Sequence, residues 1–161
     1  MFKKIIKPVL MPYFWQDLML SIPRIVCGYL LTADFGADKF GMPWSPVDKN
    51  LGLFEVAYWF PADVKNYGSI FETMPNFFAW SAGFSEAVGG LFLLLGLATR
   101  PMAFLIVCTM LVACVFQYGN GGMWNMLPAL GFLWVALYSL IMGSGKFGAD
   151  YIISRRFKNP Q

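Results

Sequence analysis

The sequence of 161 residues contains no histidine, and only 13% of its residues are charged, against about a quarter in an average soluble domain. The missing histidine excludes histidine-ligated haem, the usual zinc and non-haem iron sites, and serine–histidine catalysis. No Gly-x-Gly-x-x-Gly loop follows a predicted strand, and no P-loop or Cys-x-x-Cys pair is present, so no nucleotide, phosphate or thioredoxin-like site is indicated. The groups left for chemistry are carboxylates, a few basic side chains, aromatics and the backbone.

Cysteine is scarce as well, with three residues at Cys27, Cys108 and Cys114. Each falls in an apolar stretch and their number is odd, which disfavours disulfides and iron–sulfur clusters and predicts inert packing. Hydrophobic residues, by contrast, make up 58% of the chain, and its mean hydropathy is +0.57. This composition is typical of a membrane protein.

Long runs without charge predict where the chain crosses a bilayer, because ionisable groups are costly in hydrocarbon. The 45 residues between Arg100 and Lys146 carry no charge, and a turn-rich stretch at 117–125 divides them. We therefore expect helices near 101–118 and 125–143.

Two further spans precede Arg100. The stretch near 77–98 is apolar except for Glu86. Another span near 21–40 has Ser21 as its expected N-cap and Pro23 in its first turn, where a missing N–H costs little.

These spans predict a single all-α membrane domain over residues 1–161, built as a polytopic bundle of four transmembrane helices. Residues 1–24 and 146–161 each carry a net charge of +3, whereas residues 34–78 carry −3. The positive-inside rule places both termini in the cytoplasm and the loop 41–76 outside. The basic terminal charges then indicate contact with lipid head groups rather than a nucleic-acid surface.

The segments flanking the first span are rich in aromatic residues. Residues 9–20 are expected to lie along the inner leaflet. The loop 41–76 is expected to form short helices over the outer end of the bundle, either as an aromatic belt or as a lid over a site.

Glu86 is the most informative single residue, because an acid within a span is either paired or functional. Its neighbours at helical spacing are small, which lets another helix approach closely: Ala82, Ser85, Gly89 and Gly90. The carboxyl is interpreted either as a group that carries a proton or bonds a polar head group, or as a packing contact that fixes the bundle.

Asp34, Asp38 and Lys39 end the first predicted span, at a depth about one turn from Glu86. A shared polar cluster lining a cavity toward the outer leaflet is our hypothesis for these groups. The candidate binding residues are Glu86, Asp34, Asp38, Arg24 and Gln117.

Two of the polar residues have a second interpretation. Arg24 is expected to snorkel to the inner head groups rather than to bind a ligand. Gln117 and Asn125 flank the last outer turn, where they either cap helices or bond a ligand.

The segment Ser85–Arg100 resembles the Glu-x-x-Gly-Gly, Leu-rich, Gly-Leu-x-Thr-Arg segment of the DoxX family. Three other pieces agree: Arg24 with Gly28, Pro128-Ala129-Leu130, and Gly143-Ser144-Gly145-Lys146-Phe147-Gly148-Ala149-Asp150. The resemblance implies a small four-helix protein of the bacterial inner membrane. Family members are similar to the small subunit of thiosulfate:quinone oxidoreductase and to membrane anchors of redox or detoxification complexes.

Two functions follow as hypotheses. In the first, the chain is the membrane subunit of a quinone-linked oxidoreductase assembly, with no cofactor of its own and a quinone or lipid cleft near Glu86. In the second, it is a non-catalytic scaffold or assembly subunit of a larger membrane complex, whose Gly-rich second helix packs on a partner helix. Both predict contact with membrane lipids and with other membrane protein subunits.

Overall fold

The computed structural model describes residues 8–46 and 50–156, and helices dominate both ranges. The elements are α2 (Phe14–Leu30), the π-helical turn η1 (Leu31–Phe35), α3 (Phe60–Lys65), α4 (Ile70–Thr73), α5 (Pro75–Leu95), α6 (Thr99–Met142) and α7 (Ala149–Arg156). Within these two ranges no strand forms, and one isolated β-bridge joins Phe40 to Val56. The predicted all-α class is confirmed.

The first long helix begins earlier than the sequence pattern predicts. α2 begins at Phe14, Pro23 lies inside it, and the Ser21 hydroxyl donates to the Leu18 carbonyl one turn back. The N-cap role of Ser21 and the first-turn position of Pro23 are therefore wrong. Residues 14–20 belong to this helix and run continuously into residues 21–30.

The cause of this early start is the inward polar face of α2. Its buried residues are Asp17, Ser21, Arg24 and Gly28, spaced three or four apart. The Asp17 carboxylate pairs with the Lys146 ammonium at 3.0 Å, so this charge sits inside the protein and does not mark a helix end. Large apolar side chains cover the outer face, as suits a helix surrounded by lipid.

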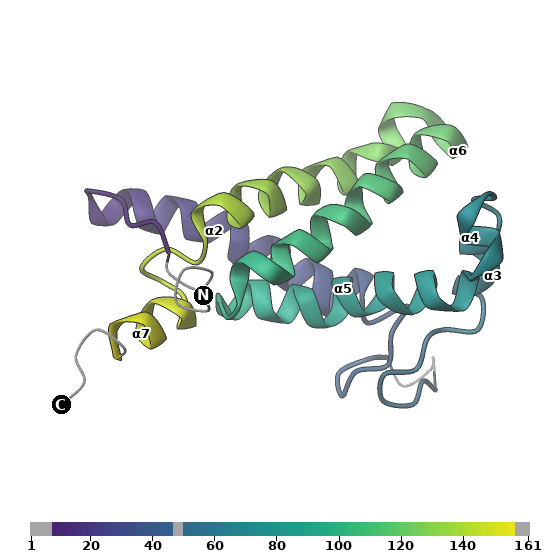
Figure 1. Ribbon diagram of the computed structural model, residues 1–161, viewed down its shortest axis with the longest axis horizontal. Helices are drawn as coiled ribbons and strands as arrows, with labels where there is room; N and C mark the ends of the chain where they lie inside the picture. The colour runs from purple at the N-terminus through teal and green to yellow at the C-terminus, as the bar shows by residue number, and fades with distance from the viewer. Residues whose placement is uncertain (1–7, 47–49, 157–161) are drawn as a thin grey trace.

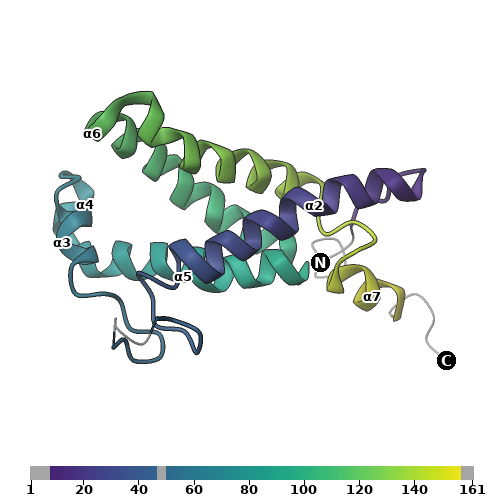
Figure 2. The ribbon, with the colours of Figure 1, turned by 180° about the vertical axis from the view of Figure 1, so that it is seen from behind.

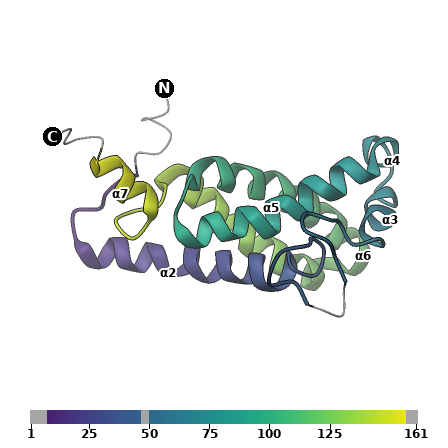
Figure 3. The same cartoon turned by 90° about the horizontal axis from the view of Figure 1, so that it is seen from below.

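α5 lies along α2, and Figure 3 shows the two helices side by side. A Cβ atom on Gly28 would lie 2.5 Å from the Leu94 nitrogen, and one on Gly90 would lie 2.8 Å from the Leu31 Cβ. The small-residue face of α5 predicted from the sequence therefore serves close packing against α2 and η1.

α6 is long enough to cross a bilayer about twice, at 44 residues and roughly 1.5 Å per residue. Its backbone leaves the helical conformation at Gly121 and Gly122, and Figure 1 shows the ribbon folding back there as a hairpin. We call residues 99–120 the first arm and residues 123–142 the second arm. The break falls inside the predicted turn 117–125.

Three helical segments are long and apolar enough to cross a membrane: Phe14–Phe35, Pro75–Leu95 and Thr99–Met142. A buried apolar core joins them, with Leu31 from η1, Leu93 from α5, and Ile106, Met110 and Leu133 from the two arms of α6. The outward faces are apolar too, because only 28% of the most apolar window of α6 is buried. An apolar exterior of this extent matches a hydrocarbon environment.

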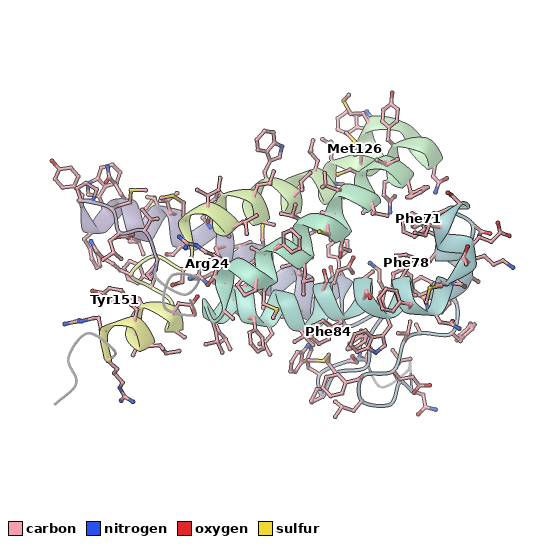
Figure 4. The ribbon with its side chains drawn as sticks, in the orientation of Figure 1. Arg24, Phe71, Phe78, Phe84, Met126 and Tyr151 are labelled. Atoms are coloured by element: carbon pink, nitrogen blue, oxygen red, sulfur yellow. The ribbon has the colours of Figure 1, made fainter. Side chains whose placement is uncertain are left out.

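The loop between η1 and α5 forms α3 and α4, which confirms the short helices expected there. Phe60 and Val64 of α3 pack with Ala57 and with Ala79 of α5 in a second buried cluster. Figure 4 shows Phe71 and Phe78 at the same end of the molecule, opposite the end where Tyr151 of α7 lies.

Candidate ligand cavity

An ion pair joins α5 to the segment that follows η1. The Lys39 ammonium donates a hydrogen bond to the Glu86 carboxylate at 2.6 Å, and Glu86 is 5% exposed. The same ammonium lies 5.9 Å from the centre of the Phe35 ring and 5.5 Å from that of the Phe60 ring. Two cation–π contacts and one ion pair therefore stabilise the Lys39 ammonium group.

The backbone fixes Lys39 in this position from both sides. Upstream, the π-helical turn closes with the Gly36 N–H donating to the Leu31 carbonyl at 2.7 Å. Downstream, the Ala57 N–H donates to the Lys39 carbonyl at 2.9 Å, and Phe40 is fully buried beside it. π-Helical turns are frequent at functional sites because the extra residue redirects the side chains that follow.

A cavity of about 340 Å³ lies beside this ion pair. It is lined by Leu31, Phe35, Lys39, Glu86, Met110, Ala113, Gln117, Trp124, Asn125, Pro128, Ala129 and Phe132. These residues come from η1, from α5 and from both arms of α6. The volume lies within the usual range of small-molecule sites, roughly 300–1,000 Å³.

The lining of the cavity is mainly apolar with a few polar groups. Lys39 offers N–H donors, the amides of Gln117 and Asn125 offer both donors and acceptors, and Glu86 offers an acceptor. Phe35 and Phe132 supply aromatic walls. This arrangement suits a flat apolar ring that carries hydrogen-bond acceptors.

Tyr67, between α3 and α4, covers this end of the bundle. Its ring stacks on Phe116 of the first arm, with centroids 3.9 Å apart and planes inclined by 7°. Burial raises the pKa of the Tyr67 phenol, and the carboxylates of Asp63 and Glu86 raise it further. The loop between η1 and α5 thus reaches the neighbourhood of Glu86 through this aromatic contact.

The structure distributes the predicted site residues unevenly. Glu86 and Gln117 both line the cavity. Asp34 is exposed, Asp38 is half-buried, and neither belongs to the lining. The pairing of Lys39 with Glu86 is the part of the hypothesised cluster that the structure brings together.

Arg24 lies at the other end of the bundle, as Figure 4 shows, and is 1% exposed. Its guanidinium donates to the carbonyls of Leu93 and Leu94 at the end of α5 and to that of Phe147. The snorkelling prediction is therefore wrong. The guanidinium thus links the last turn of α5, where carbonyls lack partners one turn further on, to the segment before α7.

The segment 143–150 completes a set of charged groups that we call the Arg24 polar cluster and define as Asp17, Arg24, Lys146 and Asp150. The Asp150 carboxylate accepts the N–H groups of Ala98 and Thr99 at 2.8 and 2.9 Å and so caps the start of α6. Much of the sequence that resembles the DoxX family thus lies in contact around one end of the bundle.

Several cavity residues lie outside the set chosen from the sequence. Phe35 and Trp124 line the cavity, and Tyr67 covers the adjacent end. Asn125, for which the sequence leaves both capping and ligand bonding open, lines the cavity too. The turn-rich stretch that contains Trp124 and Asn125 predicts the hairpin, but only the fold shows that these two side chains line the same cavity as Glu86.

Comparison with known proteins gives a family and no individual relative. No curated protein and no solved structure matches the chain. Residues 19–119 match the DoxX family over more than half of the sequence, from within α2 to the end of the first arm of α6. Together with the apolar helices, this match identifies a multi-pass membrane protein, and the chain belongs to the DoxX family.

Proposed function

We propose that the chain is an integral subunit of a quinone-linked oxidoreductase assembly in the bacterial inner membrane, and that its cavity binds the quinone head group. The observation that carries the proposal is the cavity of about 340 Å³ beside the Lys39–Glu86 ion pair. The DoxX family, which is often linked to such assemblies, supports the reaction class.

The donor set of the cavity fits a quinone. A quinone ring is flat and apolar and carries two carbonyl acceptors. Lys39 and Gln117 supply N–H groups for these carbonyls, and the rings of Phe35 and Phe132 supply apolar walls. When bound, the quinone supplies the electron-accepting chemistry, while these side chains orient its ring and exclude water.

The proposal includes a topology of four spans with both termini in the cytoplasm. α2 with η1, α5 and the two arms of α6 supply the spans. Basic residues at both ends of the chain and the acidic outer loop support this orientation. In this arrangement Arg24 lies toward the cytoplasmic side and the cavity lies in the outer half.

The structure weakens the main argument for a purely structural scaffold. That alternative uses the Gly-rich face of α5 to bind a partner helix, yet Gly90 already packs against Leu31 of the same chain. The scaffold is therefore an outcome of the test below, and the proposed partners remain other membrane subunits and lipid.

The test is decylubiquinone binding by the purified protein in mild detergent, with thermal stability and tryptophan quenching as readouts. The double variant Lys39→Met/Glu86→Gln removes the ion pair without leaving one buried charge alone. We expect it to weaken binding about tenfold or more, because a charge-assisted hydrogen bond contributes roughly 1.5–3 kcal/mol.

The matched control is Lys65→Met/Glu72→Gln, which removes the same pair of charges from exposed positions of α3 and α4. It should bind decylubiquinone as the wild type does. Gln117→Leu provides a second cavity variant that keeps the ion pair intact. Unchanged affinity in both cavity variants would refute the proposal and would favour the scaffold.

A further inference from the structure

The cavity lies where the distance between α2 with η1 and the second arm of α6 increases along the bundle. Near the inner end, the Tyr138 hydroxyl of the second arm donates to the Leu20 carbonyl of α2. Figure 2 shows α2 and the second arm separating from this region toward the end that carries α3 and α4. Cavity residues lie on both sides of this separation, with Leu31 and Phe35 on η1 and Pro128 and Phe132 on the second arm.

An aromatic contact crosses the separation. The Phe35 and Phe132 rings meet edge to face, with centroids 5.2 Å apart and planes inclined by 77°. Phe132 is buried, but Phe35 is 37% exposed, so its ring forms part of the cavity wall and also reaches the surface. Trp124, another lining residue, is 83% exposed.

The second arm carries no charged residue. On its face away from Phe132, apolar side chains such as Leu127 and Trp134 are 43% and 66% exposed, as suits a helix that contacts lipid. Toward the inner end, Leu31, Met110 and Ile106 belong to the tightly buried core. The core closes one side of the cavity, while the part-exposed ring of Phe35 forms its wall between η1 and the second arm.

We infer that the cavity opens sideways into the outer half of the bilayer between η1 and the second arm, with Phe35 as the gate. The ligand class is then an amphiphile, whose polar ring lies beside Lys39 and whose long apolar tail extends past Phe35 into lipid. This inference rests on the proposed function for the identity of the head group. The opening itself is a property of the chain and is tested without a quinone.

The experiment labels a cysteine placed in the cavity wall. Ala113→Cys is made in a background with Cys27, Cys108 and Cys114 changed to alanine, and the protein is reconstituted in phosphatidylcholine–phosphatidylglycerol vesicles. Labelling rates are measured with N-dodecylmaleimide, which partitions into lipid, and with a sulfonated methanethiosulfonate, which stays in water. Ala129→Cys is the second labelling site, should the first variant fold poorly.

We expect N-dodecylmaleimide to label the cavity cysteine. Adding Phe35→Ala should raise its rate by about three- to tenfold, the range expected for loss of one edge-to-face aromatic contact. The matched control is Phe104→Ala, an exposed aromatic of the first arm outside the cavity lining, and it should leave the rate unchanged. The sulfonated reagent should show no Phe35 dependence.

The opposite pattern overturns the inference. If Phe35→Ala leaves the N-dodecylmaleimide rate unchanged at both cysteine positions, or if only the sulfonated reagent labels the cavity, access is not lateral. Decylubiquinone binding is measured on the same vesicles. Labelling that follows Phe35 without quinone binding refutes the proposed function alone, and quinone binding without Phe35-dependent labelling refutes the lateral opening alone.

Discussion

The bundle buries charge at both ends, but the two sets of charges have different surroundings. At the end that carries α7, Arg24 binds carbonyls of α5 and of the segment before α7, and Asp150 accepts two N–H groups at the start of α6. Toward the end that carries α3 and α4, Lys39 and Glu86 bind each other beside a cavity of about 340 Å³.

The difference indicates that the charges around Arg24 stabilise the fold, whereas the Lys39–Glu86 pair is available to bind a ligand. In the Arg24 polar cluster, Arg24 and Asp150 bond to helix ends, Asp17 and Lys146 pair with each other, and these bonds join distant parts of the chain. The Lys39–Glu86 pair has space next to it, so a ligand with a carbonyl group can reach the ammonium. Variants at the two ends should therefore separate stability from binding.

Arg24→Met should have the largest effect on stability. It removes the donor for the carbonyls of Leu94 and Phe147, and each unsatisfied buried group costs about 1–3 kcal/mol. We expect a loss of about 3 kcal/mol in the free energy of unfolding, measured by chemical unfolding in detergent.

Arg24→Lys is the control for charge at this position. Lysine keeps the positive charge but cannot reproduce the planar set of donors, so it should recover only part of the stability. If Arg24→Met unfolds like the wild type but binds decylubiquinone more weakly, the separation of roles between the two ends is wrong.

Gly90→Ala should have the next largest effect, because it tests the close packing between α5 and η1. The added Cβ would lie 2.8 Å from the Leu31 Cβ and 2.8 Å from the Thr32 nitrogen, and such overpacking costs about 1–3 kcal/mol. Gly131→Ala on the second arm is the matched control, since nothing lies within 4 Å of its added Cβ.

The control should be neutral or stabilising by up to about 1 kcal/mol, the difference in helix propensity between glycine and alanine. Thermal unfolding of the two variants side by side checks this difference. Equal destabilisation by both substitutions would show that glycine matters for helix flexibility and that close packing does not explain Gly90.

The elements between Arg100 and Lys146 could be predicted from the sequence because their signal is local. The uncharged run and the turn at 117–125 locate both arms of α6 and the break at Gly121. The start of α2 could not be located in this way, because Asp17 finds its partner at Lys146, 129 residues further along the chain.

Prediction of the cavity was limited by geometry as well. Depth along the helices brings Asp34, Asp38 and Lys39 near Glu86, but it does not select among them. The π-helical turn η1 contains about one more residue per turn than an α-helix. Residues after Leu31 therefore do not lie on the helix face that a 3.6-residue period assigns to them. The contact between Lys39 and Glu86, which are 47 residues apart, therefore required the fold.

The smallest effect is expected from the link between the outer loop and the cavity at Tyr67. Burial first, and then the Asp63 and Glu86 carboxylates, raise the pKa of its phenol above the value of about 10 of an unfolded chain. The folded state thus holds the proton more tightly than the unfolded state does. The stability contributed by this group is complete at neutral pH and falls as the pH rises above about 10 through the raised pKa.

Tyr67→Phe keeps the stacking on Phe116 and should remove this alkaline dependence of stability. The ultraviolet difference spectrum of wild type and variant reports the phenolate, and a midpoint at or below about 10 would mean that the phenol faces water and that the loop does not cover the cavity end.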